Sequence, residues 1–214
     1  MLTRTDALGQ TTTLTYEPVF NKVTSVTNSL GQTITLTYDP AGNLLTSTDE
    51  NRHTTSLAYD GFGLVTAITD PLQARTTFSY DVFGNPTAIT DPLGNRTVLR
   101  YDAVSRLIET MDALGRRDRA IYDQLNRVVT QLDARNGTTQ FGYDPVGNLL
   151  SVTDAGSNKT SFAYDVRNRL VTRTTPLGKT DVRHYDLNGN LTAFVDRRGQ
   201  TSLFAYDGLV PLQG

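Results

Sequence analysis

Hydrophobic and polar residues alternate along this chain in short runs that recur at a fixed spacing. In the run that ends at Tyr80, Phe78 and Tyr80 alternate with the polar Thr77 and Ser79. A period of two places successive side chains on opposite faces of a β-strand. The residue two positions before each tyrosine is apolar in nine of ten runs, with Arg183 as the exception. The pattern therefore predicts strands with one packed face and one wetter face.

The tyrosines define the spacing of these runs. The chain has ten of them, the first two 22 residues apart and each later pair 21 apart, and an acid follows every one. This regularity indicates an array of repeats in which each unit contacts mainly its neighbours. We expect one array over residues 1–214, cut from a longer one at both ends. The motif positions are the tyrosine, the acid and the turn glycine, namely Tyr16, Tyr38, Asp39, Gly42, Tyr59, Asp60, Gly63, Tyr80, Asp81, Gly84, Tyr101, Asp102, Tyr122, Asp123, Tyr143, Asp144, Gly147, Tyr164, Asp165, Tyr185, Asp186, Gly189, Tyr206 and Asp207.

Two turn signals of the form D-x-x-G-x divide every unit. Asp39–Asn43 exemplifies the first signal and Asp91–Asn95 the second. The aspartate can accept hydrogen bonds from backbone amides ahead of it, and glycine adopts the left-handed conformation needed at the fourth position. The signal predicts a type I turn with a glycine bulge, which joins two antiparallel strands. We expect hairpin turns at Asp39–Asn43, Asp60–Leu64, Asp81–Asn85 and their equivalents, and hence two strands per unit.

Several turns depart from this formula. The first repeat has one extra residue between Glu17 and Lys22, so a longer turn is expected there. Asn28 and Thr175 replace the aspartate of a second turn. Three first turns replace their glycine, at Ser105, Asn126 and Asn168. Of these two residue types, asparagine fits the left-handed conformation better than serine does.

These signals together predict an all-β chain, an array of antiparallel β-hairpins that forms a curved, spiralling sheet. Sheets twist, and a long flat strip would leave its Tyr/Leu/Phe face in water. We therefore expect the strip to curl into an open arc of a spiral wall. Its end strands, Thr11–Tyr16 and Ser202–Tyr206, are expected to be unpaired and to promote self-association, because exposed strand edges template pairing.

Composition and charge exclude several classes of function. The net charge of −2 is too small to argue for binding to nucleic acid or to an acidic membrane. The chain has no cysteine, so a disulfide framework and a thiolate metal site are both excluded. No run of residues has the length and hydrophobicity of a signal peptide or a membrane span.

The aspartates of the second turns are the main candidates for binding chemistry, because a row of carboxylates could hold cations or sugars. Successive turns on one edge are expected about 10 Å apart, too far for two carboxylates to share one calcium ion. Each aspartate also has a turn role that accounts for its presence. We therefore favour the structural role for Asp6, Asp49, Asp70, Asp91, Asp112, Asp133, Asp154 and Asp196.

Other reactive side chains give no constellation. His53 and His184 lie in different repeats, and neither has a second ligand at metal-binding spacing. Arg116, Arg117 and Arg119 form the densest basic cluster, typical of a solvated face, with contact to cargo as the alternative. No serine or threonine has a nearby histidine–acid pair, and no phosphate-binding loop precedes a helix. We expect no catalytic residue, no cofactor and no metal site.

The repeated Y-D-x-x-G-N-L, as at Tyr38–Leu44, followed by T-D-x-L-G, as at Thr90–Gly94, resembles the YD-repeat or Rhs (rearrangement hotspot) family of the bacterial type. The resemblance covers essentially the whole chain. It implies a β-sheet strip that spirals into a large hollow shell. Two family features are missing here, namely a core segment that cuts itself and a toxin domain. Asp91–Gly94 resembles the D-P-x-G of that core, but it lies in register as an ordinary second turn.

The resemblance also implies a function. Bacterial members enclose or present the C-terminal toxin or effector domain of a larger polymorphic toxin, so this chain would be a structural segment of such a shell. The implied partners are further repeats and the C-terminal domain of the same parent chain, and the implied location is secreted or on the cell surface. The alternative is a surface or wall-associated module that binds carbohydrate or a partner protein. Aromatic rings open to solvent would favour that alternative, whereas rings covered within the wall would favour the shell.

Overall fold

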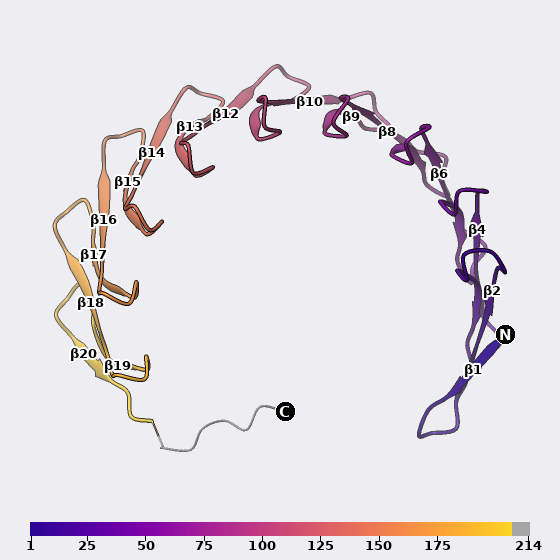
Figure 1. The fold of residues 1–214 in the computed structure, drawn as a ribbon, viewed down its shortest axis with the longest axis horizontal. Coiled ribbons are helices and arrows are strands. Elements are labelled where there is room, and N and C mark those ends of the chain that lie inside the picture. The colour runs from indigo at the N-terminus through magenta and orange to yellow at the C-terminus, as the bar shows by residue number, and fades with distance from the viewer. Residues whose placement is uncertain (207–214) are drawn as a thin grey trace. The chain divides into compact units, whose positions relative to one another are not determined.

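The computed structural model describes residues 1–206, so the predicted motif residue Asp207 lies outside the described part. The chain divides into two compact units, the first spanning Met1–Arg116 and the second beginning at Arg117. Within the described residues each unit contains β-strands and turns and no helix, as the sequence predicts. Figure 1 labels the strands in chain order.

Residues 1–206 contain twenty strands, two per repeat. The first unit contains β1 (Leu2–Thr5), β2 (Thr11–Tyr16), β3 (Val23–Thr27), β4 (Thr33–Tyr38), β5 (Leu44–Thr48), β6 (Thr54–Tyr59), β7 (Val65–Thr69), β8 (Arg75–Tyr80), β9 (Pro86–Thr90), β10 (Arg96–Tyr101) and β11 (Leu107–Met111). The second contains β12 (Arg117–Tyr122), β13 (Val128–Leu132), β14 (Thr138–Tyr143), β15 (Leu149–Thr153), β16 (Lys159–Tyr164), β17 (Leu170–Thr174), β18 (Thr180–Tyr185), β19 (Leu191–Val195) and β20 (Thr201–Leu203).

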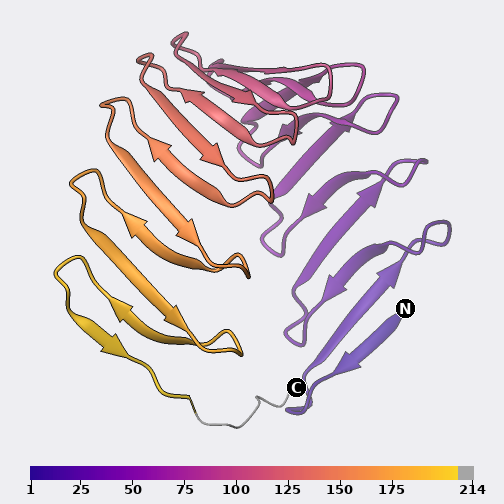
Figure 2. The ribbon, with the colours of Figure 1, turned by 60° about the vertical axis from the view of Figure 1, so that its left-hand side comes forward.

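Each unit is an antiparallel meander. Within a unit, every strand pairs with the strands that precede and follow it in sequence, for example β4 with β3 and β5. The strand that ends at a tyrosine has six residues and the strand after it has five, as in β4 and β5. Figure 2 shows the turns returning the chain alternately at two opposite ends of the strands. The predicted arrangement of two hairpin strands per repeat is confirmed.

The turns have the predicted geometry. The Asp39 amide donates to the Asn43 carbonyl at 2.9 Å, and the Gly42 amide donates to the Asp39 carbonyl at 2.9 Å. Gly42 has a φ of 84°, the left-handed conformation that follows a type I turn in a bulged hairpin. Ser105 and Asn126, which replace the glycine, have the same handedness, each with a φ of 62°.

The longer first turn is also present. The Glu17 amide donates to the Lys22 carbonyl at 2.9 Å, and Asn21 takes the left-handed position with a φ of 54°. The extra length brings Phe20 against the next turn on that edge, where a Cβ on Gly42 would lie 3.1 Å from the Phe20 ring. Gly42 therefore answers two requirements, the left-handed backbone and the close approach of an aromatic ring.

The two faces of the strip differ in chemistry. Tyr38 pairs with Leu44 across β4 and β5, and side chains opposite each other in register lie on the same face. On the other face, the hydroxyls of Thr37 and Thr46 are 2.6 Å apart. Among residues 1–206, Ala67 and Ala88 are the apolar residues that are fully buried. Each unit is thus a single β layer with one larger-residue face, and most of its side chains are half-buried or exposed.

Besides the predicted bulge at the turn, each tyrosine hairpin from β2 and β3 to β18 and β19 contains a second β-bulge that the sequence analysis did not predict. Thr37 pairs with Thr46 and Tyr38 pairs with Leu44, so Leu45 has no partner on β4. The same shift occurs at the equivalent place in the hairpin of β18 and β19. A bulge adds one residue to a strand and increases its local twist. The hairpins formed by the second turns, such as β5 with β6, have continuous register.

The expectation that Thr11–Tyr16 would be an unpaired end strand is wrong. Leu2–Thr5 forms β1, which pairs with β2 from Leu2 opposite Leu14 to Thr5 opposite Thr11. The run was overlooked because it has four residues and precedes the first tyrosine. The last described strand is Thr201–Leu203, shorter than the expected Ser202–Tyr206.

Candidate functional site

The turn aspartates bind the backbone of their own turn. Asp39 Oδ1 accepts hydrogen bonds from the amides of Ala41 at 2.9 Å and Asn43 at 2.8 Å, and its Oδ2 accepts one from the Asn43 side chain at 2.9 Å. The Asn43 side chain, followed by the Asn43 and Ala41 amides, holds the pKa of Asp39 below its usual value. Hydrogen bonds to the charged form have this effect. The carboxylate is therefore occupied in shaping the turn.

In other repeats an arginine replaces the asparagine and extends the contacts to the next repeat. Arg127 Nε donates to Asp123 Oδ2 at 2.7 Å, and its Nη1 donates to the Asp144 carbonyl at 2.9 Å. Its guanidinium carbon also lies 4.8 Å from the centre of the Tyr143 ring. This distance is typical of a cation–π contact. Arg169 makes the equivalent contacts, with its guanidinium carbon 4.6 Å from the centre of the Tyr185 ring.

The tyrosine hydroxyls also join successive repeats. Six of them donate to the carbonyl of the residue 15 positions earlier, which begins the second strand of the preceding tyrosine hairpin. The two residues of each pair are 15 positions apart in the sequence. The sequence analysis therefore assigned the tyrosines to packing alone. The constant spacing between tyrosine and a Leu or Val is the signal that could have revealed the bond. The pairs are Tyr38 with Val23 at 2.8 Å, Tyr59 with Leu44 at 2.9 Å, Tyr80 with Val65 at 2.7 Å, Tyr143 with Val128 at 3.0 Å, Tyr185 with Leu170 at 3.0 Å and Tyr206 with Leu191 at 3.0 Å.

The second-turn aspartates also bind the backbone of their own turns. Asp91 Oδ1 accepts hydrogen bonds from the Leu93 amide at 2.9 Å and the Asn95 amide at 2.8 Å, so the D-P-L-G sequence there is an ordinary turn. Within residues 1–206, no group of three or more His, Asp or Glu side chains is placed to hold a metal ion. The same role is found at Asp6, Asp49, Asp70, Asp112, Asp133, Asp154 and Asp196.

The two histidines and the expected basic cluster are dispersed. His53 Nδ1 lies 3.0 Å from Asp49 Oδ2 within one turn, and His184 is exposed on β18. Arg116 pairs with Asp112 in the last turn of the first unit, whereas Arg117 and Arg119 belong to β12.

The sequence analysis missed a charged cluster on the larger-residue face of the second unit. Asp181 on β18 has a side chain that is 3% exposed, and both Nε and Nη2 of Arg173 on β17 donate to its Oδ2. Arg197 Nε donates to Asp181 Oδ1 at 3.3 Å. Burial would raise the pKa of Asp181, but the hydrogen bond and charge of Arg173, with those of Arg197, hold it below its usual value. The arginines come from separate strands and turns, so only the register of the sheet brings them together.

Arg183 lies on the same face of β18, two residues beyond Asp181. Its guanidinium carbon is 5.2 Å from the centre of the Phe194 ring, and its Nη1 is buried with no hydrogen-bond partner in the described part of the chain. The sequence analysis noted Arg183 only as a break in the apolar pattern. The position is instead part of a group of charged residues, here named the arginine patch: Arg173, Asp181, Arg183 and Arg197.

Comparison with known proteins agrees with this architecture. Among solved structures, the crystal structure of TcdB2-TccC3-TEV matches with a TM-score of 0.62 and 16% identity over 94% of this chain, and that of TcdB2-TccC3-Cdc42 with 0.61 and 16% over 94%. The pore structure of the Photorhabdus luminescens Tc holotoxin with a TccC3 variant matches with a TM-score of 0.56 and 15% identity over 87%. The chain spans only about 14% of the length of the first two of these proteins. At such identities the likeness concerns the fold.

Sequence comparison points to the family. A search of curated proteins found no match. No helix in residues 1–206 is long and apolar enough to cross a membrane. The family profile named RHS Repeat matches residues 19–55, 59–97 and 143–180, together more than half of the chain. With its 21-residue spacing, its tyrosine–acid turns and its all-β meander, the chain belongs to the RHS repeat family.

Proposed function

We propose that this chain is a wall segment of an RHS-repeat shell that encloses the C-terminal toxin or effector domain of a larger bacterial protein. The observation that carries the proposal is the connection between repeats: six tyrosine hydroxyls each donate to a carbonyl of the preceding repeat. Such bonds make a continuous strip out of units too small to fold alone. The likeness to TccC3-containing toxin structures supports this role.

In this proposal residues 1–214 act as one array. The tyrosine spacing of 21 residues continues without change across the boundary between the two compact units. The partners are further repeats and the C-terminal domain of the parent chain, and the protein acts outside the cell that makes it or on its surface. The chain itself catalyses no reaction, since its carboxylates serve the turns and the histidines stand apart.

The alternative of a carbohydrate-binding tyrosine face receives less support. A sugar platform needs ring faces open to solvent, whereas Tyr143 and Tyr185 are half-buried and each is covered by an arginine. Exposed rings do occur at the turn tips, where Phe62 is 93% and Phe83 77% exposed. These belong to two neighbouring turns and not to a ladder along the array.

Protection from proteolysis tests the proposal. The parent protein that contains these repeats would be digested beside its C-terminal domain expressed alone. If the repeats form an enclosing wall, the C-terminal domain resists digestion in the parent protein and is cleaved when alone. Equal cleavage rates in the two samples would contradict enclosure. If the C-terminal domain expressed alone also resists digestion, the comparison is repeated with a variant of that domain that carries an engineered protease site.

A further inference from the structure

The arginine patch carries more positive charge than its carboxylates neutralise. Asp181 is the acid that Arg173 and Arg197 share, and Arg183 has no carboxylate partner among the described residues. Arg183 adds positive charge to the patch but lines neither hollow beside it, so an anion there would contact Arg173 and Arg197. The patch is therefore unusual on a face that carries apolar or neutral residues in most other repeats.

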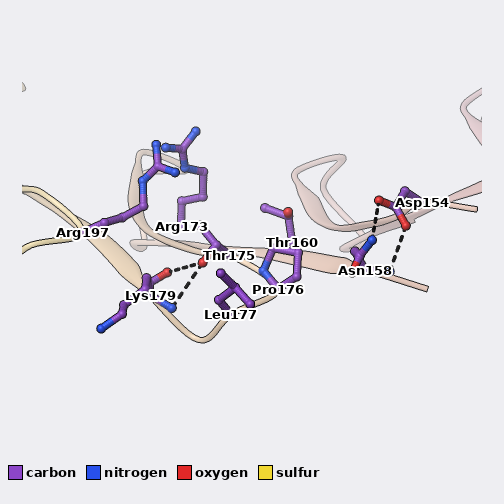
Figure 3. Close-up of a pocket in the computed structure, with 9 residues that line it drawn as sticks. All are labelled: Asp154, Asn158, Thr160, Arg173, Thr175, Pro176, Leu177, Lys179 and Arg197. Atoms are coloured by element: carbon purple, nitrogen blue, oxygen red, sulfur yellow. Dashed lines mark hydrogen bonds between the residues drawn. The ribbon is translucent and has the colours of Figure 1, made fainter. Parts of the chain in front are cut away.

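A hollow next to the patch gives an anion access to the arginines. Arg173 and Arg197 line it together with Thr160, Pro176 and Leu177. In Figure 3 the two guanidinium ends lie close to one another on one side of the hollow, and Leu177 lies beside Pro176 at the turn, away from these ends. The side chains of Arg173 and Arg197 are 35% and 54% exposed, so solvent and ligand can reach them. Asp154 lies at the far side of the hollow, where it binds the Asn158 side chain at 3.0 Å.

The turn at this place also lacks the carboxylate present in most others. Thr175 occupies the aspartate position, and its Oγ1 accepts only a weak hydrogen bond from the Lys179 amide at 3.2 Å. No negative charge therefore faces the arginines from that turn. Pro176 and Leu177 give it an apolar surface instead, and Leu177 is 88% exposed.

We propose that the arginine patch binds an acidic side chain, glutamate or aspartate, of a polypeptide segment packed against the repeats. Arg173 and Arg197 retain guanidinium N–H groups that Asp181 does not use, and a carboxylate matches the planar fork of such donors. Leu177, which lines the same hollow, offers an apolar contact to another residue of that segment. A neutral sugar fits less well, because the aromatic ring of the patch, Phe194, lies against Arg183.

The inference deepens the proposed function, since the enclosed domain is the polypeptide that would supply the acid. The two can nevertheless fail separately. Proteolytic protection measures enclosure in the parent protein, whereas peptide binding measures the patch on the 214-residue chain alone. Binding without protection would leave the patch as a docking site for a different acidic polypeptide.

Fluorescence anisotropy with short labelled peptides tests the proposal. The probe is a peptide of repeated Glu-Leu-Gly, and the matched control replaces each glutamate with glutamine. Arg197→Gln should weaken binding of the acidic peptide about tenfold, the usual loss for one charge-assisted hydrogen bond. Asp181 keeps its partner Arg173 in this variant, and circular dichroism checks that the fold is retained.

Lys159→Gln is the matched control variant. Lys159 is exposed and directly precedes Thr160 on β16, so the two side chains lie on opposite faces of the strand. The substitution therefore removes one positive charge from the face opposite the arginine patch. Its affinity for the acidic peptide should remain within about twofold of the unaltered chain, because a distant surface charge is screened. Equal weakening by Lys159→Gln and Arg197→Gln, or equal binding of the Glu and Gln peptides, would overturn the proposal. So would binding of a sulfated oligosaccharide or anionic vesicles at concentrations where the acidic peptide does not bind.

Discussion

In the first unit the strands around Tyr80 carry Ile68, Thr76 and Phe78 on their larger-residue face. In the second unit the equivalent positions around Tyr185 hold arginine, aspartate and arginine. The backbone is nevertheless the same. Tyr80 donates to the carbonyl 15 residues earlier at 2.7 Å and Tyr185 does so at 3.0 Å, and both hairpins have the same register shift before the tyrosine.

This difference distinguishes the residues that hold the repeat together from those whose chemistry can change without altering the backbone. The turns and the tyrosine hydroxyls hold the strands in place, and they are retained where the face between them changes from apolar to charged. Asp181 is buried on that face, but it is paired with Arg173 and Arg197, whose side chains remain 35% and 54% exposed because the sheet is a single layer. The face is therefore free to carry a binding feature without loss of the fold.

Acid should have the largest effect, because the turn carboxylates act together in both regions. The pKa of Asp81 near Tyr80 is lowered by the Asn85 side chain, and that of Asp186 near Tyr185 by the Asn190 side chain. Between the folded and unfolded pKa values the unfolded chain binds more protons, so the free energy of unfolding rises with pH. The stabilisation is complete above the unfolded value of about 3.9 and is lost as the pH falls through the lower folded values. Urea unfolding followed by circular dichroism from pH 6 to pH 2 measures this, and a flat profile would contradict it.

Asp181→Ala should have the next largest effect, and it breaks the charged region alone. It removes the shared acid of Arg173 and Arg197, with an expected loss of about 2 kcal/mol in the free energy of unfolding. The loss stays below that of a deep buried pair because both arginines are partly exposed. Thr76→Ala at the equivalent position near Tyr80 should cost less than about 0.5 kcal/mol. Urea unfolding compares the two, and equal losses would mean that Asp181 contributes only its packing.

Replacing the tyrosine hydroxyl should weaken both regions to a similar extent. Tyr80→Phe and Tyr185→Phe each remove one hydrogen bond between repeats and keep the ring, with an expected loss of about 1 kcal/mol in each case. Hydrogen–deuterium exchange of the flanking strands measures the loss locally, which suits an array that need not unfold as one unit. A much smaller loss at Tyr185 would show that the charged face, and not the hydroxyl, holds that repeat.

The sequence could predict what is decided locally. Turn positions such as Asp39–Asn43 follow from the residue types within the turn, and the strands follow from the alternation between turns. The bulge at Leu45 could not be predicted, because no residue type marks it. The tyrosine hydroxyl bonds leave a trace in the sequence, the constant 15-residue spacing, but the bond itself requires the register between strands. The contacts of Asp181 with Arg173 and Arg197 also depend on that register, and no repeated spacing marks them.

The smallest effect concerns the turn skeleton that both regions share. Gln73 occupies the fourth position of a second turn with a φ of 67°, whereas Gly94 occupies the same position of the next one with a φ of 85°. Left-handed backbone costs a residue with a Cβ about 1 kcal/mol, partly offset when glycine makes the unfolded chain more flexible. Gln73→Gly should therefore raise the free energy of unfolding by about 0.5 kcal/mol, and Gly94→Gln should lower it by a similar amount. A Cβ on Gly94 would meet no atom within 4 Å, so its loss would reflect backbone conformation and not crowding. Urea unfolding of both variants at neutral pH checks the signs. If Gln73→Gly instead lowered the free energy of unfolding, the contribution of position 73 to stability would come from contacts of the Gln73 side chain and not from the turn conformation.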